Sequence, residues 1–131
     1  MILIDTSAWI AFFRDRGPVA SAVDQALEDD EAALCGPVLA ELRRGFPTAA
    51  ERNRTIPLLS ACHQLSQPSE LWNEAGDLGF VLARKGITVK TLDLLIAAYA
   101  LSHRIPILTL DSDFRLIARS GVGLHVMSTV T

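Results

Sequence analysis

Ile2-Leu3-Ile4-Asp5 and Ile107-Leu108-Thr109-Leu110-Asp111 decide the fold, because each is a short apolar run that ends in a carboxylate. Runs of this length are typical of strands that are buried on both faces of a parallel sheet. In such sheets, ligands bind beyond the carboxyl ends of the strands, where the strand order reverses. If these two strands are neighbours, Asp5 and Asp111 face a shared site.

The rest of the chain alternates helical and strand-like segments. Apolar residues at a helical spacing, with capping or breaking residues at the ends, predict helices over 6–14, 19–30, 37–46, 49–62, 69–85, 92–103 and 113–120. Pro57 is expected to kink or break the fourth of these. Further strands are predicted at 32–35, 105–110 and 124–127, with a short extended piece from Leu65. This alternation predicts an α/β fold with three layers, α/β/α, around a central parallel sheet of four to five strands.

Length and composition favour one domain that does not cross a membrane. The 131 residues suit a single domain, residues 1–131. Half of the residues are hydrophobic and the mean hydropathy is +0.29, but the longest apolar stretches are Ala8 to Phe13 and Leu94 to Leu101. Both are far shorter than the roughly 18 residues of a membrane span. Because Met1 leads directly into a strand-like run without a basic leader, we expect a cytoplasmic protein.

The cysteines and the net charge limit which metal ligands and which partners the chain can have. Cys35 and Cys62 belong to no Cys-x-x-Cys or Cys/His cluster, which predicts buried free thiols and leaves oxygens as the metal ligands. The formal net charge of −3 by itself argues against a nucleic-acid partner. Setting aside five candidate metal-binding carboxylates leaves twelve basic side chains against ten acidic ones. Bound divalent ions would also offset much of the acidic cluster, so an RNA substrate stays admissible.

Five carboxylates form the candidate catalytic and metal-binding site: Asp5, Glu41, Asp93, Asp111 and Asp113. Taken alone, Asp5 and Asp111 are explained as helix caps, and Glu41 as the partner of a nearby arginine. Taken alone, Asp93 would be explained by a favourable interaction with the dipole of its helix. A carboxylate in so apolar a segment, however, costs free energy unless it is paired or bound to metal. All five fall at a strand end or helix start expected to face one crevice. Hard oxygen ligands in this number suit Mg²⁺ or Mn²⁺.

The five carboxylates predict a mechanism. An ion held by Asp5, Asp93 and the turn of Asp111 and Asp113 would bind an oxygen of the scissile phosphate and lower the pKa of a water molecule. Either Asp111 or Asp113 is the direct ligand at that turn. Glu41 would hold a second ion or orient the attacking water, and two ions about 4 Å apart would stabilise both the entering and the leaving oxygen.

Polar and basic residues flank the carboxylates. Four hydroxyl side chains are expected to orient the ligands or, equally, to cap helices: Thr6, Ser7, Thr109 and Ser112. Three basic residues would contact RNA phosphates or, alternatively, remain solvated charges: Arg43, Arg44 and Lys90.

Four motifs in order resemble the PIN-domain ribonucleases, especially the VapC-type toxins of type II toxin–antitoxin pairs. They are residues 1–7 (MILIDTS), Glu41 with 42–45 (LRRG), 93–98 (DLLIAA) and 109–114 (TLDSDF). The resemblance covers the whole chain and implies a parallel sheet with helices on both sides and Mg²⁺-dependent endonucleolytic cleavage of RNA, with Mn²⁺ as a substitute. It also implies a homodimer, which a higher toxin–antitoxin assembly would contain, and a small antitoxin that covers the acidic pocket.

Two other functions compete with the endoribonuclease. A catalytically inactive PIN-like module would bind RNA or an antitoxin without cutting. A phosphoacceptor switch resembling a receiver domain also clusters carboxylates at strand ends, but it needs a late lysine, and no lysine follows Lys90. The chain has neither a Gly-x-x-x-x-Gly-Lys-Ser/Thr loop for nucleotide phosphates nor a Gly-x-Ser-x-Gly elbow for acyl transfer.

Overall fold

A four-stranded parallel sheet with strand order β3-β2-β1-β4 organises the computed structural model, which describes residues 1–129. The strands are β1 (Ile2–Ile4), β2 (Ala32–Leu34), β3 (His63–Gln64) and β4 (Ile107–Leu108). From β1 the chain steps outward through β2 to β3, and β4 is then added on the other side of β1. The strand order therefore reverses between β1 and β4, where the sequence predicts the site.

The pairing of β1 with β4 places the two predicted strand ends side by side. Leu3 pairs with Ile107 and Ile4 with Leu108, and the backbone N–H of Asp5 donates to the carbonyl of Leu108 at 3.0 Å. None of these four apolar side chains has exposed surface, as expected for strands covered on both faces. Asp5 and Thr109, the next residues on each strand, are consequently neighbours.

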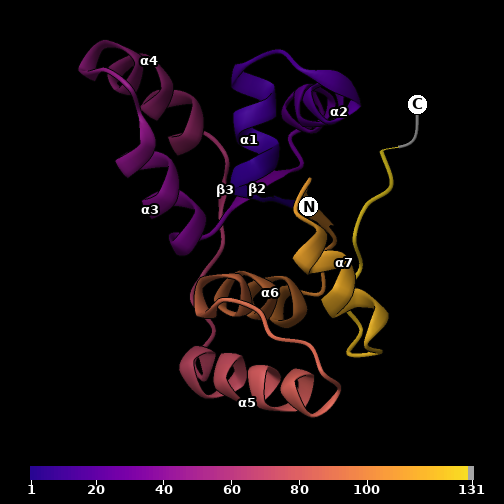
Figure 1. Ribbon diagram of the computed structural model, residues 1–131. Coiled ribbons are helices and arrows are strands. Elements are labelled where there is room, and N and C mark those ends of the chain that lie inside the picture. Colours follow the sequence, from indigo (N-terminus) through magenta and orange to yellow (C-terminus); the bar gives the residue numbers. More distant parts are fainter. Residues whose placement is uncertain (130–131) are drawn as a thin grey trace.

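Helices cover both faces of the sheet, which confirms the predicted three-layer α/β/α fold (Figure 1). The helices α1 and α2 pack together on one side, α5 and α6 pack together on the other, and α3 and α4 form an arm beside α1. Within residues 1–129 the helices are α1 (Thr6–Phe13), α2 (Gly17–Glu28), α3 (Gly36–Gly45), α4 (Ala49–Ser60), α5 (Leu71–Arg84), α6 (Thr91–His103) and α7 (Ser112–Arg119).

Helix α6 is the most buried of these helices. Every residue from Asp93 to Ala100 is buried, in agreement with a sequence that leaves the helix almost no polar face. Asp93 is therefore a carboxylate at the start of a core helix. None of the helices in the described part of the chain combines the length and apolarity that crossing a membrane requires.

The predicted strand at 124–127 is wrong. The segment makes one isolated parallel bridge, between Val126 and Ile107, so the sheet has four strands in residues 1–129. Gly121 and Gly123 both have positive φ angles, of 87° and 92°, and this irregular turn brings only one residue into register with β4. Buried Leu124 holds the segment against the core without extending the sheet.

The strand predicted at 105–110 is shortened to Ile107–Leu108. Pro106 has no N–H to donate to a ladder. Beyond Leu108, the N–H groups of Leu110 and Asp111 donate to side-chain hydroxyls, those of Ser7 and Thr109, instead of to a neighbouring strand. The strand therefore ends where the candidate site begins.

Two smaller expectations on the α4 to β3 segment are also corrected. Helix α4 continues through Pro57 without a break. Pro57 and Asn53 lie on its exposed face, so the carbonyl left without a donor stays open to water. The next extended segment starts at His63, two residues before Leu65, whose N–H still donates to Leu34 at 2.9 Å.

Candidate metal centre

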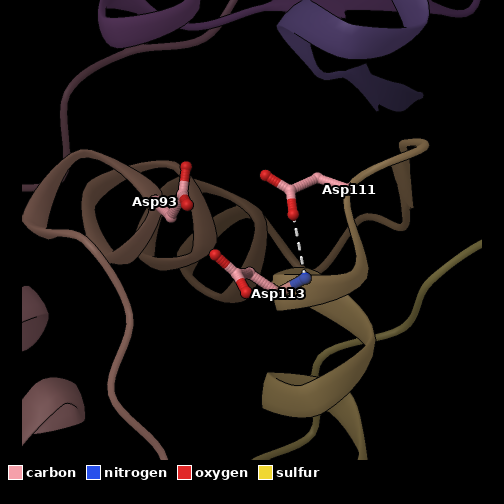
Figure 2. A group of neighbouring side chains, drawn as sticks. All are labelled: Asp93, Asp111 and Asp113. Atoms are coloured by element: carbon pink, nitrogen blue, oxygen red, sulfur yellow. Dashed lines mark hydrogen bonds between the residues drawn. The ribbon is translucent and has the colours of Figure 1, made fainter.

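Three of the five predicted carboxylates converge. Asp93, Asp111 and Asp113 each offer an oxygen, and these oxygens lie within 4.8 Å of one another. Figure 2 shows Asp93 on α6 with the carboxylates of Asp111 and Asp113, at the start of α7, pointing toward it. Asp5 and Glu41 stand outside this set of three, which we call the aspartate triad.

Helix starts position the triad. Asp93 lies in the first turn of α6. Asp111 caps α7, since its Oδ1 accepts the N–H of Asp113 at 2.9 Å, and Asp113 lies in the first turn of that helix. Helix N-termini favour negative charge, which lowers the cost of bringing these carboxylates together. The capping bond uses one oxygen of Asp111 and leaves Oδ2 for another partner.

Asp5 is buried and held by two hydroxyls. The side chain of Thr109 donates to Asp5 Oδ2 at 2.8 Å, and the side chain of Ser7 donates to the same oxygen at 2.9 Å. Asp5 itself is 4% exposed. Because both donors occupy Oδ2, the carboxylate is oriented with Oδ1 as the oxygen open to a further ligand.

The same two hydroxyls also fix the turn that carries Asp111. Ser7 Oγ accepts the N–H of Leu110 at 2.9 Å, and Thr109 Oγ1 accepts the N–H of Asp111 at 2.9 Å. Each hydroxyl thus donates to Asp5 and accepts from the β4 to α7 turn. Asp5 and Asp111 are linked through this hydroxyl pair of Ser7 and Thr109, so the position of one depends on the position of the other.

Glu41 joins the site through Thr6. The Thr6 hydroxyl donates to Glu41 Oε1 at 2.7 Å, which connects the start of α1 to α3 immediately beside Asp5. Of the four hydroxyl residues predicted to orient ligands, Thr6, Ser7 and Thr109 contact a predicted carboxylate. Ser112 is exposed at the start of α7 and makes no side-chain hydrogen bond within residues 1–129.

Within residues 1–129, no arginine or lysine forms an ion pair with the candidate carboxylates. Over the described residues the only ion pair within 4.0 Å is between His63 and Asp30, outside the site. Arg43 and Arg44 lie exposed in the last turn of α3, and Lys90 precedes α6, close enough to lower the pKa of Asp93. Of the predicted basic residues, only Lys90 is thus shown to act on a site carboxylate, and none forms an ion pair there within residues 1–129, so much of the negative charge is left for a cation to balance.

Asp93 carries the clearest electrostatic signal. Burial raises its pKa from 3.8 to about 6, Lys90 opposes the rise, and the like charges of Asp111, Asp5 and Asp113 add to it. Its Oδ2 is buried without a hydrogen-bond partner among the described residues. A buried carboxylate oxygen without a donor is costly, and a cation ligand removes that cost.

The raised pKa of Asp93 predicts a pH dependence of stability for the metal-free protein. Because the folded state holds the proton more tightly than the unfolded state, this stability is fully present below about pH 4 and is lost as the pH rises through about 6. The loss is at most about 3 kcal/mol. In EDTA, Asp93→Asn should therefore unfold at a higher temperature than wild type at pH 8 and at a similar temperature at about pH 4, below the range over which the loss develops. An equal difference at both pH values would contradict this assignment.

The two cysteines are free and buried, as predicted. Cys35 precedes α3, and burial, together with the negative charges of Asp5 and Glu41, raises the pKa of its thiol to about 12. A neutral thiol is a poor ligand for Mg²⁺ or Mn²⁺. Cys35 therefore packs beside the site without adding to its ligands.

The sequence did not predict a groove that lies beside Glu41. It has a volume of about 530 Å³ and runs between α1, α3 and α4, and we call it the side groove. Thr6 and Glu41 line one part of it, so the groove shares two residues with the candidate site. Other lining residues are Ile10, Phe13, Arg14, Phe46 and Arg54. No sequence motif marks these residues, because they meet only once the α3/α4 arm is placed beside α1.

Comparison with known sequences identifies a domain and relatives. The profile of the PIN domain matches residues 2–120. VapC ribonuclease Mb1587 of Mycobacterium bovis is 34% identical over 124 residues, which cover 91% of this chain and 92% of that protein. Ribonuclease VapC5 of Mycobacterium tuberculosis is 33% identical over 118 residues, which cover 86% of this chain and 84% of that protein.

Solved structures share the fold. VapBC2 from Rickettsia felis, bound to a DNA fragment from its promoter, has a chain that matches with a TM-score of 0.77 at 21% identity, covering 97% of this chain and 98% of that one. VapBC-5 from Mycobacterium tuberculosis, of the VapBC family of toxin–antitoxin systems, matches with a TM-score of 0.64 at 27% identity and covers 95% of each chain. At 21% identity, the match to VapBC2 shows a shared fold alone. The match to VapBC-5 combines the shared fold with a higher identity of 27%.

Proposed function

The chain belongs to the PIN-domain family and, within it, to the VapC ribonucleases, and we propose that it is a metal-dependent endoribonuclease that serves as the toxin of a toxin–antitoxin pair. One observation carries the metal dependence. Oxygens of three carboxylates lie within 4.8 Å of one another with no arginine or lysine in an ion pair with them over residues 1–129, and one of the three has a buried oxygen without a hydrogen-bond donor among these residues.

The residues fit a divalent cation. Octahedral coordination at about 2.1 Å places ligand oxygens roughly 3 to 4 Å apart, close to the spacing within the aspartate triad. The donors are all carboxylate oxygens, which Mg²⁺ and Mn²⁺ prefer. We assign Asp93, Asp111 and Asp113 as the holders of the ion, with Oδ1 of Asp5 beside them, and Mg²⁺ as the ion, for which Mn²⁺ substitutes.

The chain's own residues then have distinct tasks in hydrolysis. When bound, the ion supplies Lewis-acid polarisation of the scissile phosphate and acidifies a water molecule. Ser7 and Thr109 keep Asp5 turned with Oδ1 outward. Glu41, whose Oε1 is held by Thr6, uses Oε2 to accept a proton from the attacking water or to hold a second ion. Arg43, Arg44 and Lys90, all exposed, are assigned to contacts with RNA phosphates.

The partners of the toxin follow from the family. VapBC-5, the relative in the solved structure, is a member of a toxin–antitoxin family. For this chain we assign RNA as the substrate, an antitoxin protein as the inhibitor and a second copy of the chain as a homodimer partner, within a larger toxin–antitoxin assembly. A basic antitoxin side chain would offset the unpaired carboxylates and thereby compete with the metal ion.

Cleavage of total RNA tests this function. Purified protein should produce discrete fragments with Mg²⁺ or Mn²⁺ and none in excess EDTA, and fragments should reappear when Mn²⁺ is restored. Added cognate antitoxin should suppress them. Fragments that persist in EDTA would indicate a contaminating metal-independent nuclease. RNA that is bound but uncut with every divalent ion would favour the noncatalytic module.

A further inference from the structure

The side groove is lined by more residues than the proposed hydrolysis uses. Its wall includes Thr6 and Glu41, which lie at the catalytic centre, but it also extends between α1 and α4. A cavity of about 530 Å³ is in the range that holds a drug-sized ligand, comparable to about one or two nucleotides. A polymeric substrate cut at the aspartate triad must place its neighbouring units somewhere, and this groove is lined by Glu41 and by Thr6, the residue that follows Asp5.

An aromatic platform stands in this groove. Phe13 is 40% exposed, and its ring stacks on the fully buried ring of Trp9 at a centroid distance of 5.9 Å and an angle of 25°. Phe12 packs edge-on against Trp9, so the platform is fixed from below by two further rings. Phe46, which follows α3, also lines the groove. The outer face of Phe13 is therefore a rigid surface on which a flat ring can stack at little entropic cost.

Two arginines in the groove have no acidic partner. Arg14 follows α1 and Arg54 lies on α4, and both are exposed. Neither makes an ion pair within residues 1–129, although Glu51 lines the same groove. Unpaired guanidinium groups beside an exposed aromatic face are the combination that binds single-stranded nucleic acid, through phosphate contacts and base stacking.

We propose that the side groove binds the unpaired nucleotides next to the scissile phosphate, with a base stacked on Phe13 and phosphates held by Arg14 and Arg54. The proposal rests on the proposed endoribonuclease function and adds to it the side chains that hold the nucleotides beside the cut. A duplex keeps its bases stacked inside and offers no free ring to Phe13. Residues of the groove thereby contribute to the choice of cleavage site.

Binding measurements test the groove. The probe is a fluorescein-labelled random pool of 12-nucleotide single-stranded RNA, and fluorescence anisotropy is recorded in an Asp93→Asn background to prevent cleavage. Adding Phe13→Ala or Arg54→Ala should raise the Kd about tenfold. Arg54→Ala should also reduce the slope of log Kd against log salt by about 0.7, whereas Phe13→Ala should leave the slope in place.

Two matched substitutions serve as controls. Arg52 is exposed on the same helix as Arg54, and Phe80 is a 59% exposed phenylalanine on α5, but neither lines the groove. Arg52→Ala and Phe80→Ala should leave the Kd within twofold. Equal losses for Arg52→Ala and Arg54→Ala would overturn the proposal, because they would indicate diffuse charge attraction.

A small substrate separates this proposal from the proposed function. Bis(p-nitrophenyl) phosphate with Mn²⁺ reports the metal site without the groove. In the otherwise wild-type protein, Phe13→Ala and Arg54→Ala should lower the ratio of RNA cleavage to hydrolysis of this phosphodiester about tenfold, through KM. An unchanged ratio, with loss only of antitoxin affinity, would overturn the RNA assignment and identify a protein-binding groove. Absence of both activities in wild type would instead defeat the proposed function.

Discussion

Asp93→Asn is expected to lower RNA cleavage by at least about 10³-fold in kcat/KM while leaving the fold intact. The side chain belongs to the aspartate triad, and its Oδ2 is buried without a hydrogen-bond donor in the part of the chain that the structure describes. The amide of asparagine has almost the same shape as the carboxylate, but it offers one neutral oxygen in place of two oxygens that share a negative charge. Loss of a direct ligand should cost more than the 10- to 100-fold typical of residues that only orient ligands. A factor of 10³ corresponds to about 4 kcal/mol of transition-state stabilisation.

The control for this substitution is Asp77→Asn, an exposed carboxylate on α5 outside the site. It should retain wild-type cleavage, as judged by initial rates on total RNA in saturating Mg²⁺. Circular dichroism should give the same secondary structure for both variants. Full activity of Asp93→Asn would remove Asp93 from the ligand set and, with it, the buried part of the proposed metal site. Asp5→Asn should abolish cleavage by the same argument.

The location of the candidate site follows from strand ends, which the sequence reveals. Asp5 and Asp111 follow short apolar runs, and a parallel sheet with a reversal between β1 and β4 brings such ends together whatever the detailed loops. Asp93 was identifiable as a charge at the start of a helix with almost no polar face. In each case a residue conflicts with its apolar surroundings, and that conflict is visible in the sequence.

Other features depend on tertiary placement that no local pattern encodes. The apolar residues at 124–127 have the composition of a strand, but two glycines with positive φ allow only a single bridge to β4. Arg54 and Phe13 are 41 positions apart and share a groove only because α4 lies beside α1. The division among the hydroxyls is also tertiary, since Ser7 reaches Leu110 and Thr109 across the β1 to β4 junction, whereas Ser112 remains in solvent.

Thr109→Val is expected to weaken the apparent affinity for Mn²⁺ by about 10- to 100-fold. The substitution keeps the shape of a fully buried side chain and removes only its hydroxyl. Asp5 Oδ2 then loses one of its two donors, and the N–H of Asp111 loses its acceptor. Because the hydroxyl pair links Asp5 to the turn of Asp111, both carboxylates gain freedom at once. The metal concentration for half-maximal cleavage should rise, with a smaller change in kcat once Mn²⁺ saturates.

Thr109→Ser separates positioning from packing. Serine keeps the hydroxyl and deletes a buried methyl group, which costs on the order of 1 kcal/mol of stability. Thr109→Val leaves an unsatisfied N–H and costs about 1 to 3 kcal/mol. Both variants should therefore melt below wild type, but only the valine variant should need more Mn²⁺, since only it releases Asp5. If the serine variant shows the same metal requirement as the valine variant, Thr109 acts through core packing and the hydroxyl link between Asp5 and Asp111 has no part in metal binding.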